Sequence, residues 1–402
     1  MTRKALHKLL IMLIFAGCES PPMEVRSLES PALLGSRFPN LTTTSEGTVI
    51  MSWFTPYNDQ GGYELKMAEW DGTLWSEPNT IYKGDDFFVN WADVPSVFQV
   101  NGDRLAAHWL YMRGGGTYEY DVYLSTSYDR GLTWSEPMIP HRDGVAAEHG
   151  FVSFFHRESR GLGMAWLDGR NMIPSDDGHG SGAMSVFTTI LNQENQLGAE
   201  FSLDARVCEC CPTAAATIGA SNIIAYRDRG EEEIRNIQVV RYNEGVWSQP
   251  STVHEDGWMI PGCPVNGPAL AVEEDRLAIA WYTAPNGDAQ VNVAFSDDVG
   301  ASFSEPVRID GGIPLGRVDI EWVDHSSVIV SWIEVIEDSA ELKLRKVSFK
   351  GEVDSPLVVS NIDAGRGSGN PQMVNYKNEL VFAWTEPGQW KIRMARLNKN
   401  SI

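Results

Sequence analysis

The sequence predicts an all-β protein, a single β-propeller built from four-stranded antiparallel blades. A motif of the form S-x-D-x-G-x-T-W occupies Ser127–Trp134 and returns, with Phe as its last residue, at Ser296–Phe303. Apolar strands that end in an aromatic residue recur seven times, at intervals of 51 to 60 residues. The 402 residues include 14 Trp and 37 Gly, a composition typical of many short strands joined by tight turns.

The repeated motif has the chemistry of a hairpin turn. Asp129 can accept hydrogen bonds from backbone N–H groups two or more residues later, and Gly131 tolerates a positive φ. Trp134 then supplies a large apolar anchor for the neighbouring strand. A Ser-Glu-Pro tail follows both copies, and weaker tails occur at 72–78 and 245–250. We therefore expect one such turn for each of several repeated units.

The recurring aromatic residues define seven units. They are Trp53, Trp109, Trp166, Tyr226, Trp281, Trp332 and Trp384. Each closes an apolar run of the kind expected for an inner strand that is buried on both faces. Seven units favour a seven-bladed ring, and a six-bladed ring is the alternative if one long blade has been counted twice. The last unit lacks a tail, so we expect a strand near residues 24–28 to complete it and close the ring.

The motif resembles the Asp-box, or BNR repeat, of the bacterial sialidase (neuraminidase) superfamily, and Ser36–Leu41 resembles the sialidase R-I-P motif. In that family the Asp-boxes lie on outer turns away from the active site, and the ring has six blades. The resemblance implies that Arg37 is the first of three arginines that clamp a sugar carboxylate, a task that suits the planar guanidinium fork. It implies a glycoside hydrolase similar to an exo-α-sialidase, which needs no cofactor.

The same resemblance implies further site residues. Asp59 is the expected catalytic acid, on a loop after the R-I-P strand. The second and third arginines are expected among Arg227, Arg235, Arg317 and Arg366. Sialidases also use a Tyr nucleophile paired with Glu, for which Tyr226 or Tyr376 with a glutamate from 231–233 are the candidates.

In a propeller the first strand of each blade lines the central channel, and the residues that open these strands point to one face. The openings are expected at 36–39, 92–95, 148–151, 211–213, 263–266, 317–319 and 370–371. They carry residues unusual for the start of a strand, among them Asp93 and His149. Because buried polar groups need partners, we expect these openings to form one convergent polar site on the axis.

Four cysteines lie in the openings of units four and five: Cys208, Cys210, Cys211 and Cys263. In an oxidising compartment they are expected to form disulfides, with Cys211–Cys263 as one bridge and a strained Cys208–Cys210 bridge as the other. A site for copper or zinc, with His149 or His254 as a further ligand, is the first alternative. A redox-active thiol is the second.

The N-terminus predicts export. Residues 1–17 have a basic start and an apolar core, as signal peptides do, and Phe15–Cys18 resembles a lipobox in which Cys18 receives lipid. Residues 18–23 then form a tether, and 24–402 form the propeller. A net charge of −22 without a basic patch argues against nucleic acid as a partner. We expect a monomer that is lipid-anchored in the bacterial cell envelope, at the outer membrane.

Three functions follow from these observations. The first is a lipid-anchored, sialidase-like envelope protein that binds or hydrolyses acidic glycans at the central face of the propeller. The second is a non-catalytic propeller that binds a protein or polysaccharide partner. The third is a metal or redox protein that uses the four cysteines.

Overall fold

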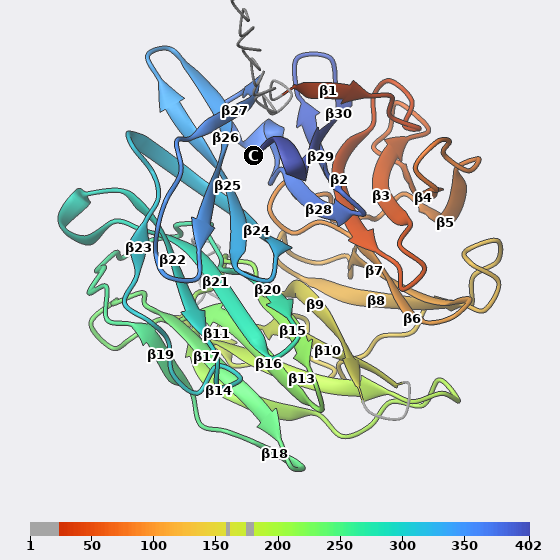
Figure 1. The fold of residues 1–402 in the computed structure, drawn as a ribbon. Coiled ribbons are helices and arrows are strands. Elements are labelled where there is room, and N and C mark those ends of the chain that lie inside the picture. Colours follow the sequence, from red (N-terminus) through yellow and green to blue (C-terminus); the bar gives the residue numbers. More distant parts are fainter. Residues whose placement is uncertain (1–23, 158–160, 174–180) are drawn as a thin grey trace, which may run out of the picture.

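The computed structural model describes residues 24–157, 161–173 and 181–402. The predicted signal peptide, Cys18 and the whole tether therefore lie outside the described residues. Within the described ranges, the chain forms seven antiparallel sheets arranged as blades around a central axis (Figure 1). The prediction of an all-β propeller with seven blades is confirmed.

The first four blades follow the chain in order. Blade 1 contains β2 (Arg37–Thr43), β3 (Val49–Pro56), β4 (Tyr63–Trp70) and β5 (Asn79–Gly84). Blade 2 contains β6 (Ser96–Asn101), β7 (Arg104–Met112) and β8 (Tyr120–Ser127), and a bridge from Leu124 to Met138 marks its outer edge. Blade 3 contains β9 (His149–Arg157), β10 (Gly161–Asp168), β13 (Met184–Leu191) and β14 (Phe201–Val207), with a small hairpin of β11 (Met172–Ile173) and β12 (Ser181–Gly182). Blade 4 contains β15 (Ala214–Ile218), β16 (Ser221–Arg227), β17 (Ile237–Asn243), β18 (Val246–Trp247) and β19 (Ser251–His254).

The last three blades complete the ring. Blade 5 contains β20 (Ala269–Glu273), β21 (Arg276–Thr283), β22 (Gln290–Ser296) and β23 (Val307–Arg308). Blade 6 contains β24 (Ile313–Asp324), β25 (Ser327–Ile336), β26 (Ser339–Ser348) and β27 (Leu357–Ile362). Blade 7 contains β28 (Gln372–Tyr376), β29 (Glu379–Glu386), β30 (Lys391–Asn398) and β1 (Val25–Leu28). Three short 3-10 turns accompany them: η2 (Pro285–Gly287), η3 (Arg366–Ser368) and η4 (Lys399–Ser401).

The ring closes as the sequence predicts. β1 pairs antiparallel with β30, so that Val25 lies opposite Leu397 and Leu28 opposite Met394. In Figure 1 the red first strand lies beside the blue last strands. The first and last parts of the chain thus share one blade, and this pairing removes the two free edges that an open array would have.

The core lies between neighbouring blades. The recurring aromatic residues all belong to the second strand of a blade, and five of the tryptophans are almost fully buried: Trp53, Trp109, Trp166, Trp281 and Trp332. Several donate their indole N–H to a polar side chain two residues later, as Trp166 does to Asp168 at 2.7 Å and Trp332 to Glu334 at 3.0 Å. Such bonds allow a large aromatic residue to be buried without an unpaired donor.

The two motif copies form turns with the same hydrogen bonds. Asp129 Oδ1 accepts from the backbone N–H of Thr133 at 2.9 Å, and Asp298 Oδ1 accepts from Ser302 N–H at the same distance. Gly131, at φ 83°, donates its N–H to Ser127 Oγ at 2.8 Å. Each turn follows the third strand of its blade, at the end remote from where the inner strand begins. We call this side the turn face and the side where the inner strands begin the opening face.

No helix long and apolar enough to span a membrane occurs among residues 24–157, 161–173 and 181–402.

Candidate functional site on the opening face

The openings of the inner strands are bonded to one another across blades. Asp93 Oδ2, in blade 2, accepts from Phe151 N–H of blade 3 at 2.6 Å. Asn266 Oδ1, in the opening of blade 5, accepts from Arg317 N–H of blade 6 at 2.7 Å. Asp319 Oδ2 of blade 6 accepts from Met373 N–H of blade 7, also at 2.7 Å. The polar residues that the sequence placed at these openings therefore form a belt that joins blade to blade.

The backbone of the belt adopts an unusual conformation. Phe38, Phe151, Val265 and Arg317 open four different blades, and their φ values lie between 51° and 55°. Bulky and β-branched residues rarely adopt a positive φ, because it brings the side chain against the backbone. In blades 1, 3 and 6 the pairing of the inner strand with its neighbour shifts register close to this point. Bulges of this kind redirect side chains, and they occur often beside functional sites.

Arginine and tryptophan side chains form a rim over blades 6, 7, 1 and 2. We use the name arginine–tryptophan rim for Arg37, Arg317, Arg366, Trp91 and Trp390. The Arg37 guanidinium lies over the Trp390 ring at 4.0 Å, and also 5.5 Å from the ring of Tyr63. Arg317 and Arg366 lie 4.7 and 6.0 Å from the ring of Trp91.

Close packing connects the two parts of the rim. The Phe38 ring meets that of Trp390 edge to face at 6.2 Å. A Cβ atom added to Gly369 would lie 3.3 Å from the Phe38 ring and 3.6 Å from the carbonyl oxygen of Trp91. Gly369 has a φ of 71°, so glycine suits this position both for its backbone conformation and for the close approach. The loop at Gly369 can thus pass between the Phe38 ring and the Trp91 carbonyl group. Arg37, Arg317 and Arg366 therefore lie on one contiguous surface.

The arginines of the rim have different surroundings. The Arg317 guanidinium donates to the carbonyl oxygens of Gly365 and Gly369, each at 3.0 Å, and to Ser368 Oγ at 2.7 Å. Burial lowers the pKa of Arg317 to about 10, and the neighbouring positive charge of Arg366 acts in the same direction. Arg366 itself is exposed, and no hydrogen bond or ion pair within the described part of the chain engages its guanidinium. Arg317 therefore holds the loop, while Arg366 is available to a ligand.

A hydrogen-bonded Tyr–Glu pair lies between blades 2 and 3. Tyr120 Oη donates to Glu148 Oε1 at 2.6 Å. Burial raises the pKa of Glu148 to about 7, and burial likewise raises the pKa of Asp93 to about 7. Near neutral pH these carboxyl groups can therefore both take up and release protons, as general acid–base catalysis requires. Glu148 lies in a predicted opening, but nothing in the sequence around Tyr120 distinguishes it from other strand tyrosines.

The charge of Glu209 links the Tyr–Glu pair to the cysteines. It acts on Glu148 and adds to the rise of the Glu148 pKa. The Glu209 carboxylate is paired with the guanidinium groups of Arg229 and Arg235, the latter at 3.2 Å. Two acidic groups, Glu148 and Glu209, therefore act on each other between blades 3 and 4, and two arginines pair with the second.

The four cysteines converge, but with different neighbours from those predicted. Cys208 Sγ lies 2.7 Å from Cys211 Sγ and 3.9 Å from Cys210 Sγ. The Cys210 thiol also contacts that of Cys263. All four are free thiols, and the expected Cys211–Cys263 and Cys208–Cys210 disulfides are not formed. Burial opposes ionisation of Cys211, yet its thiol neighbours and the Arg227 guanidinium hold its pKa below the ordinary value.

Other residues predicted from the sialidase resemblance lie apart from the rim. Arg227 is buried and donates to the carbonyl oxygens of Asn266 at 2.8 Å and Arg235 at 2.7 Å. Tyr226 Oη donates to Asp204 Oδ2 at 2.7 Å rather than to a glutamate of 231–233. Asp59 is exposed in the loop that leads into Tyr63, whose ring lies near the Arg37 guanidinium.

A second buried polar cluster joins blades 2 and 3. His141 and His149 stack with ring centroids 3.7 Å apart, and His149 Nε2 lies 3.2 Å from Asp143 Oδ2. Burial opposes protonation of His149, but the hydrogen bond to Asp143 and the charge of Asp168 raise its pKa above the ordinary value. Burial lowers the pKa of His141 to about 3, so His149 is the imidazole of the stack that binds a proton more readily. His149 thus contacts carboxylates rather than the cysteines for which it was an expected co-ligand.

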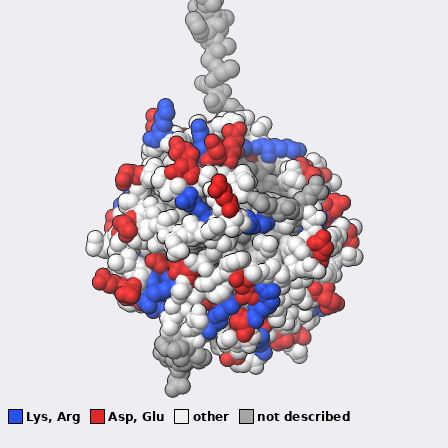
Figure 2. All heavy atoms as spheres, turned by 90° about the horizontal axis from the view of Figure 1, so that it is seen from below, with Lys and Arg blue, Asp and Glu red and all other residues white. Residues whose placement is uncertain are grey.

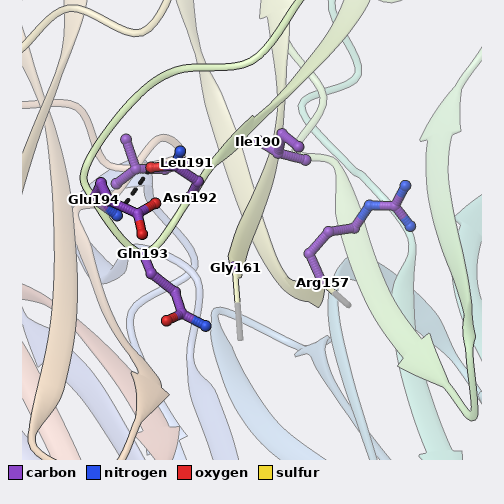
Figure 3. A pocket seen from close by; sticks show the side chains of 7 residues that line it. All are labelled: Arg157, Gly161, Ile190, Leu191, Asn192, Gln193 and Glu194. Atoms are coloured by element: carbon purple, nitrogen blue, oxygen red, sulfur yellow. Dashed lines mark hydrogen bonds between the residues drawn. The ribbon is translucent and has the colours of Figure 1, made fainter. Parts of the chain in front are cut away.

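Two of the hollows in the described surface have similar volumes. One, of about 530 Å³, includes Trp258, Pro261 and Asn286 and lies beside the Cys263 loop. The other, of about 490 Å³, lies on the turn face between Arg157 and the turn 192–194 (Figure 3). There Arg157 extends away from that turn and donates to Asn222 Oδ1 at 2.9 Å. Over the surface in Figure 2, acidic and basic side chains are intermingled.

No protein-family model and no curated protein matches the sequence. Many solved structures share the fold. They include the polysaccharide lyase Uly1, with a TM-score of 0.54 and 10% identity, over 96% of this chain and 94% of the lyase. They also include a Hadza microbial sialidase, with a TM-score of 0.49 and 12% identity, over 85% of this chain and 74% of that one.

The polysaccharide lyase has the fold of this chain over almost the whole length of both proteins. A Penicillium chrysogenum α-L-arabinanase complexed with arabinobiose has it as well, with a TM-score of 0.48 and 10% identity, over 95% of this chain and 99% of the arabinanase. The similarity of all three is one of fold. The residues of the opening face must therefore provide the basis for any function of this chain.

Proposed function

We propose that this chain is a glycan-active envelope protein whose opening face binds acidic glycans. The arginine–tryptophan rim is the observation that carries the proposal. An exposed guanidinium beside an indole ring combines a bidentate donor for a carboxylate with a flat apolar surface for a sugar ring. Arg366 with Trp91 offers this combination. Arg37 lies over Trp390, but it is half-buried and donates to the carbonyl oxygen of Gly35, so it lines the same surface with part of its donors already used. The polysaccharide lyase with the same fold is consistent with a glycan ligand.

The test is binding of acidic and neutral oligosaccharides of matched length, measured by calorimetry. Sialyllactose, an oligouronate and a neutral oligosaccharide provide the comparison. Arg366→Ala should weaken binding of an acidic ligand at least tenfold, because a charge-assisted hydrogen bond contributes about 1.5–3 kcal/mol. Within the described residues no hydrogen bond or ion pair engages the Arg366 guanidinium, and the Trp91 ring is 6.0 Å away, so this variant should fold normally.

Arg26→Ala is the matched control. Its side chain is half exposed on the outer strand of blade 7, with a 3.7 Å contact to Glu24, and it lies outside the rim. Equal effects of both arginine variants would show only general attraction by positive charge. Saturable binding of a protein extract without binding of any glycan would instead support the propeller as a protein-binding module.

Hydrolysis of the glycan is a second candidate function, and the Tyr120–Glu148 pair favours it. A carboxyl group with a pKa of about 7 is suited to protonate a leaving oxygen, and the neighbouring tyrosine resembles the Tyr–Glu arrangement of sialidases. Turnover of a fluorogenic sialoside, with loss of turnover but not of binding in Glu148→Gln, would support an enzyme. An inactive wild-type protein that binds acidic glycans would restrict the function to binding.

The lipid anchor belongs to the same proposal. A lipobox-like sequence ends at Cys18, and the propeller begins only a few residues later. Metabolic labelling with a fatty acid should mark the wild-type protein in the membrane fraction and leave Cys18→Ser unlabelled. Recovery of unlabelled wild-type protein in the soluble fraction would contradict anchoring.

A further inference from the structure

We infer that Cys208, Cys210, Cys211 and Cys263 together bind one thiophilic d10 cation, Zn²⁺ or Cu⁺. The sulfur atoms of the first three all lie within 4.8 Å of one another, and Cys210 also contacts the thiol of Cys263. Thiolate sulfur is the donor that selects zinc and monovalent copper among common cations. This inference concerns a site distinct from the arginine–tryptophan rim and does not depend on glycan binding.

The sulfur geometry fits a four-coordinate centre. In a tetrahedral zinc–thiolate site with bonds of about 2.3 Å, neighbouring sulfur atoms lie about 3.8 Å apart. Cys208 Sγ and Cys210 Sγ are already 3.9 Å apart. Cys208 Sγ and Cys211 Sγ are closer, at 2.7 Å, so a bound cation needs to spread this pair by about 1 Å. Cys208 and Cys211 are buried, while Cys263 is exposed, which gives a cation a route of entry from the solvent side.

The two loops that carry the cysteines are held together by the fold. Three cysteines precede β15 of blade 4 and the fourth precedes β20 of blade 5. A Cβ atom at Gly267 would lie 2.0 Å from the carbonyl oxygen of Pro212, so only glycine permits this approach of the two loops. The Asn266 N–H also bonds to Cys211. The fourth ligand is therefore placed by tertiary structure and not by proximity in the sequence.

The net charge of the four sulfur atoms differs between a cation site and a pair of disulfides. Arg227 is 1% exposed and its charge acts on Cys211, but within the described ranges no carboxylate forms an ion pair with its guanidinium. A buried guanidinium without an anion is costly. Four thiolates around Zn²⁺ carry a net charge of −2, and around Cu⁺ a net charge of −3, whereas two disulfides carry none. Of these two sulfur arrangements, only the anionic centre adds negative charge beside Arg227, whose charge also acts on the Asp256 carboxyl group.

Metal content is the direct test. The full chain, purified under reducing conditions, is incubated separately with Zn²⁺ and, without oxygen, with Cu⁺, and metal per chain is measured after desalting. Co²⁺ is then used as a spectroscopic probe, because it gives intense visible bands and thiolate charge-transfer bands in a tetrahedral sulfur site. One equivalent of metal per chain is expected, and competition between Zn²⁺ and Cu⁺ identifies the preferred cation.

Cys208→Ser and Cys263→Ser should each reduce retained metal at least tenfold. Cys18→Ser alters the only cysteine outside the cluster and should retain one equivalent. Circular dichroism checks the fold of each variant, and alkylation of the wild type provides a measurement that needs no variant. Bound metal should protect all four thiols, and a chelator should expose them. Two disulfides in the unreduced protein, four reactive thiols after metal loading, or metal retention by both serine variants of the cluster would overturn the inference.

Discussion

On the two faces of the propeller, hydrogen bonds join residues at very different separations along the chain. On the turn face, each copy of the repeated motif satisfies its hydrogen bonds within a few residues, as when Asp298 accepts from the N–H and the hydroxyl of Ser302. On the opening face, the corresponding bonds join blades, as when Asp319 accepts from Met373 N–H 54 residues away. The turn face therefore stabilises individual hairpins, whereas the opening face holds the ring together and positions its polar side chains.

The comparison predicts that the largest losses of stability come from inter-blade bonds of the opening face. Arg227→Met removes the donor for the carbonyl oxygens of Asn266 and Tyr282 in blade 5 and of Arg235 in blade 4. A buried polar group without a partner costs about 1–3 kcal/mol, so we expect a loss of about 3 kcal/mol or more. Chemical denaturation of the metal-free protein measures this loss.

Arg366→Met provides the matched control for that experiment. This variant also introduces methionine on the opening face, but in place of an exposed arginine. It should change the free energy of unfolding by less than about 0.5 kcal/mol. A small effect of Arg227→Met would show that the inter-blade bonds contribute little, and the contrast between the two faces would then be wrong.

A second inter-blade contact makes stability depend on pH. Glu321 lies between the inner strands of blades 6 and 7 and accepts from Asn375 Nδ2 at 2.7 Å. Burial and then the charge of Asp319 raise the pKa of Glu321 to about 8. Because the folded state binds this proton more tightly than the unfolded state, the stabilisation is complete below about pH 4.5. It is lost as pH rises towards 8.

Glu321→Gln should therefore reduce the loss of stability between pH 5 and pH 8. A tenfold change in proton affinity corresponds to about 1.4 kcal/mol, so the rise of the pKa from 4.5 to about 8 gives an expected difference of roughly 3 kcal/mol across this range. Thermal unfolding at both pH values measures it, with Glu352→Gln on an exposed turn as the control. An unchanged pH dependence would mean that Glu321 does not titrate in this range.

The sequence predicted the turn face more completely than the opening face, for a physical reason. Ser127, Asp129 and Gly131 lie within five residues, so their hydrogen bonds follow from local geometry alone. Seven blades and the closing strand followed from the period of the repeat, because one blade cannot bury its faces alone. The openings and the convergence of the cysteines were also predicted, since equivalent positions in a ring must lie near one axis.

Pairings across the opening face could not be predicted in the same way. Tyr120 and Glu148 are 28 residues apart, and their contact depends on how blade 3 packs against blade 2. Arg227 and Arg366 look equally suitable as ligands in the sequence, yet one is buried against carbonyl oxygens and the other is exposed. Burial and side-chain direction at these positions depend on tertiary packing, which a repeat period does not specify.

The smallest expected effect belongs to the turn face. Gly131 has a φ of 83°, and a Cβ atom there would lie 2.5 Å from the sulfur of Met67. Gly47 has a similar φ of 76°, but nothing lies within 4 Å of its Cβ position. Gly47→Ala should therefore lower the free energy of unfolding by about 1 kcal/mol, because alanine disfavours the left-handed backbone conformation. Gly131→Ala should lower it by roughly 1 kcal/mol more, because of the contact with Met67. The difference between their unfolding free energies isolates the contact of the turn at Ser127–Trp134 with blade 1. Equal losses would mean that the turn stabilises only its own hairpin and that Met67 moves aside at no cost.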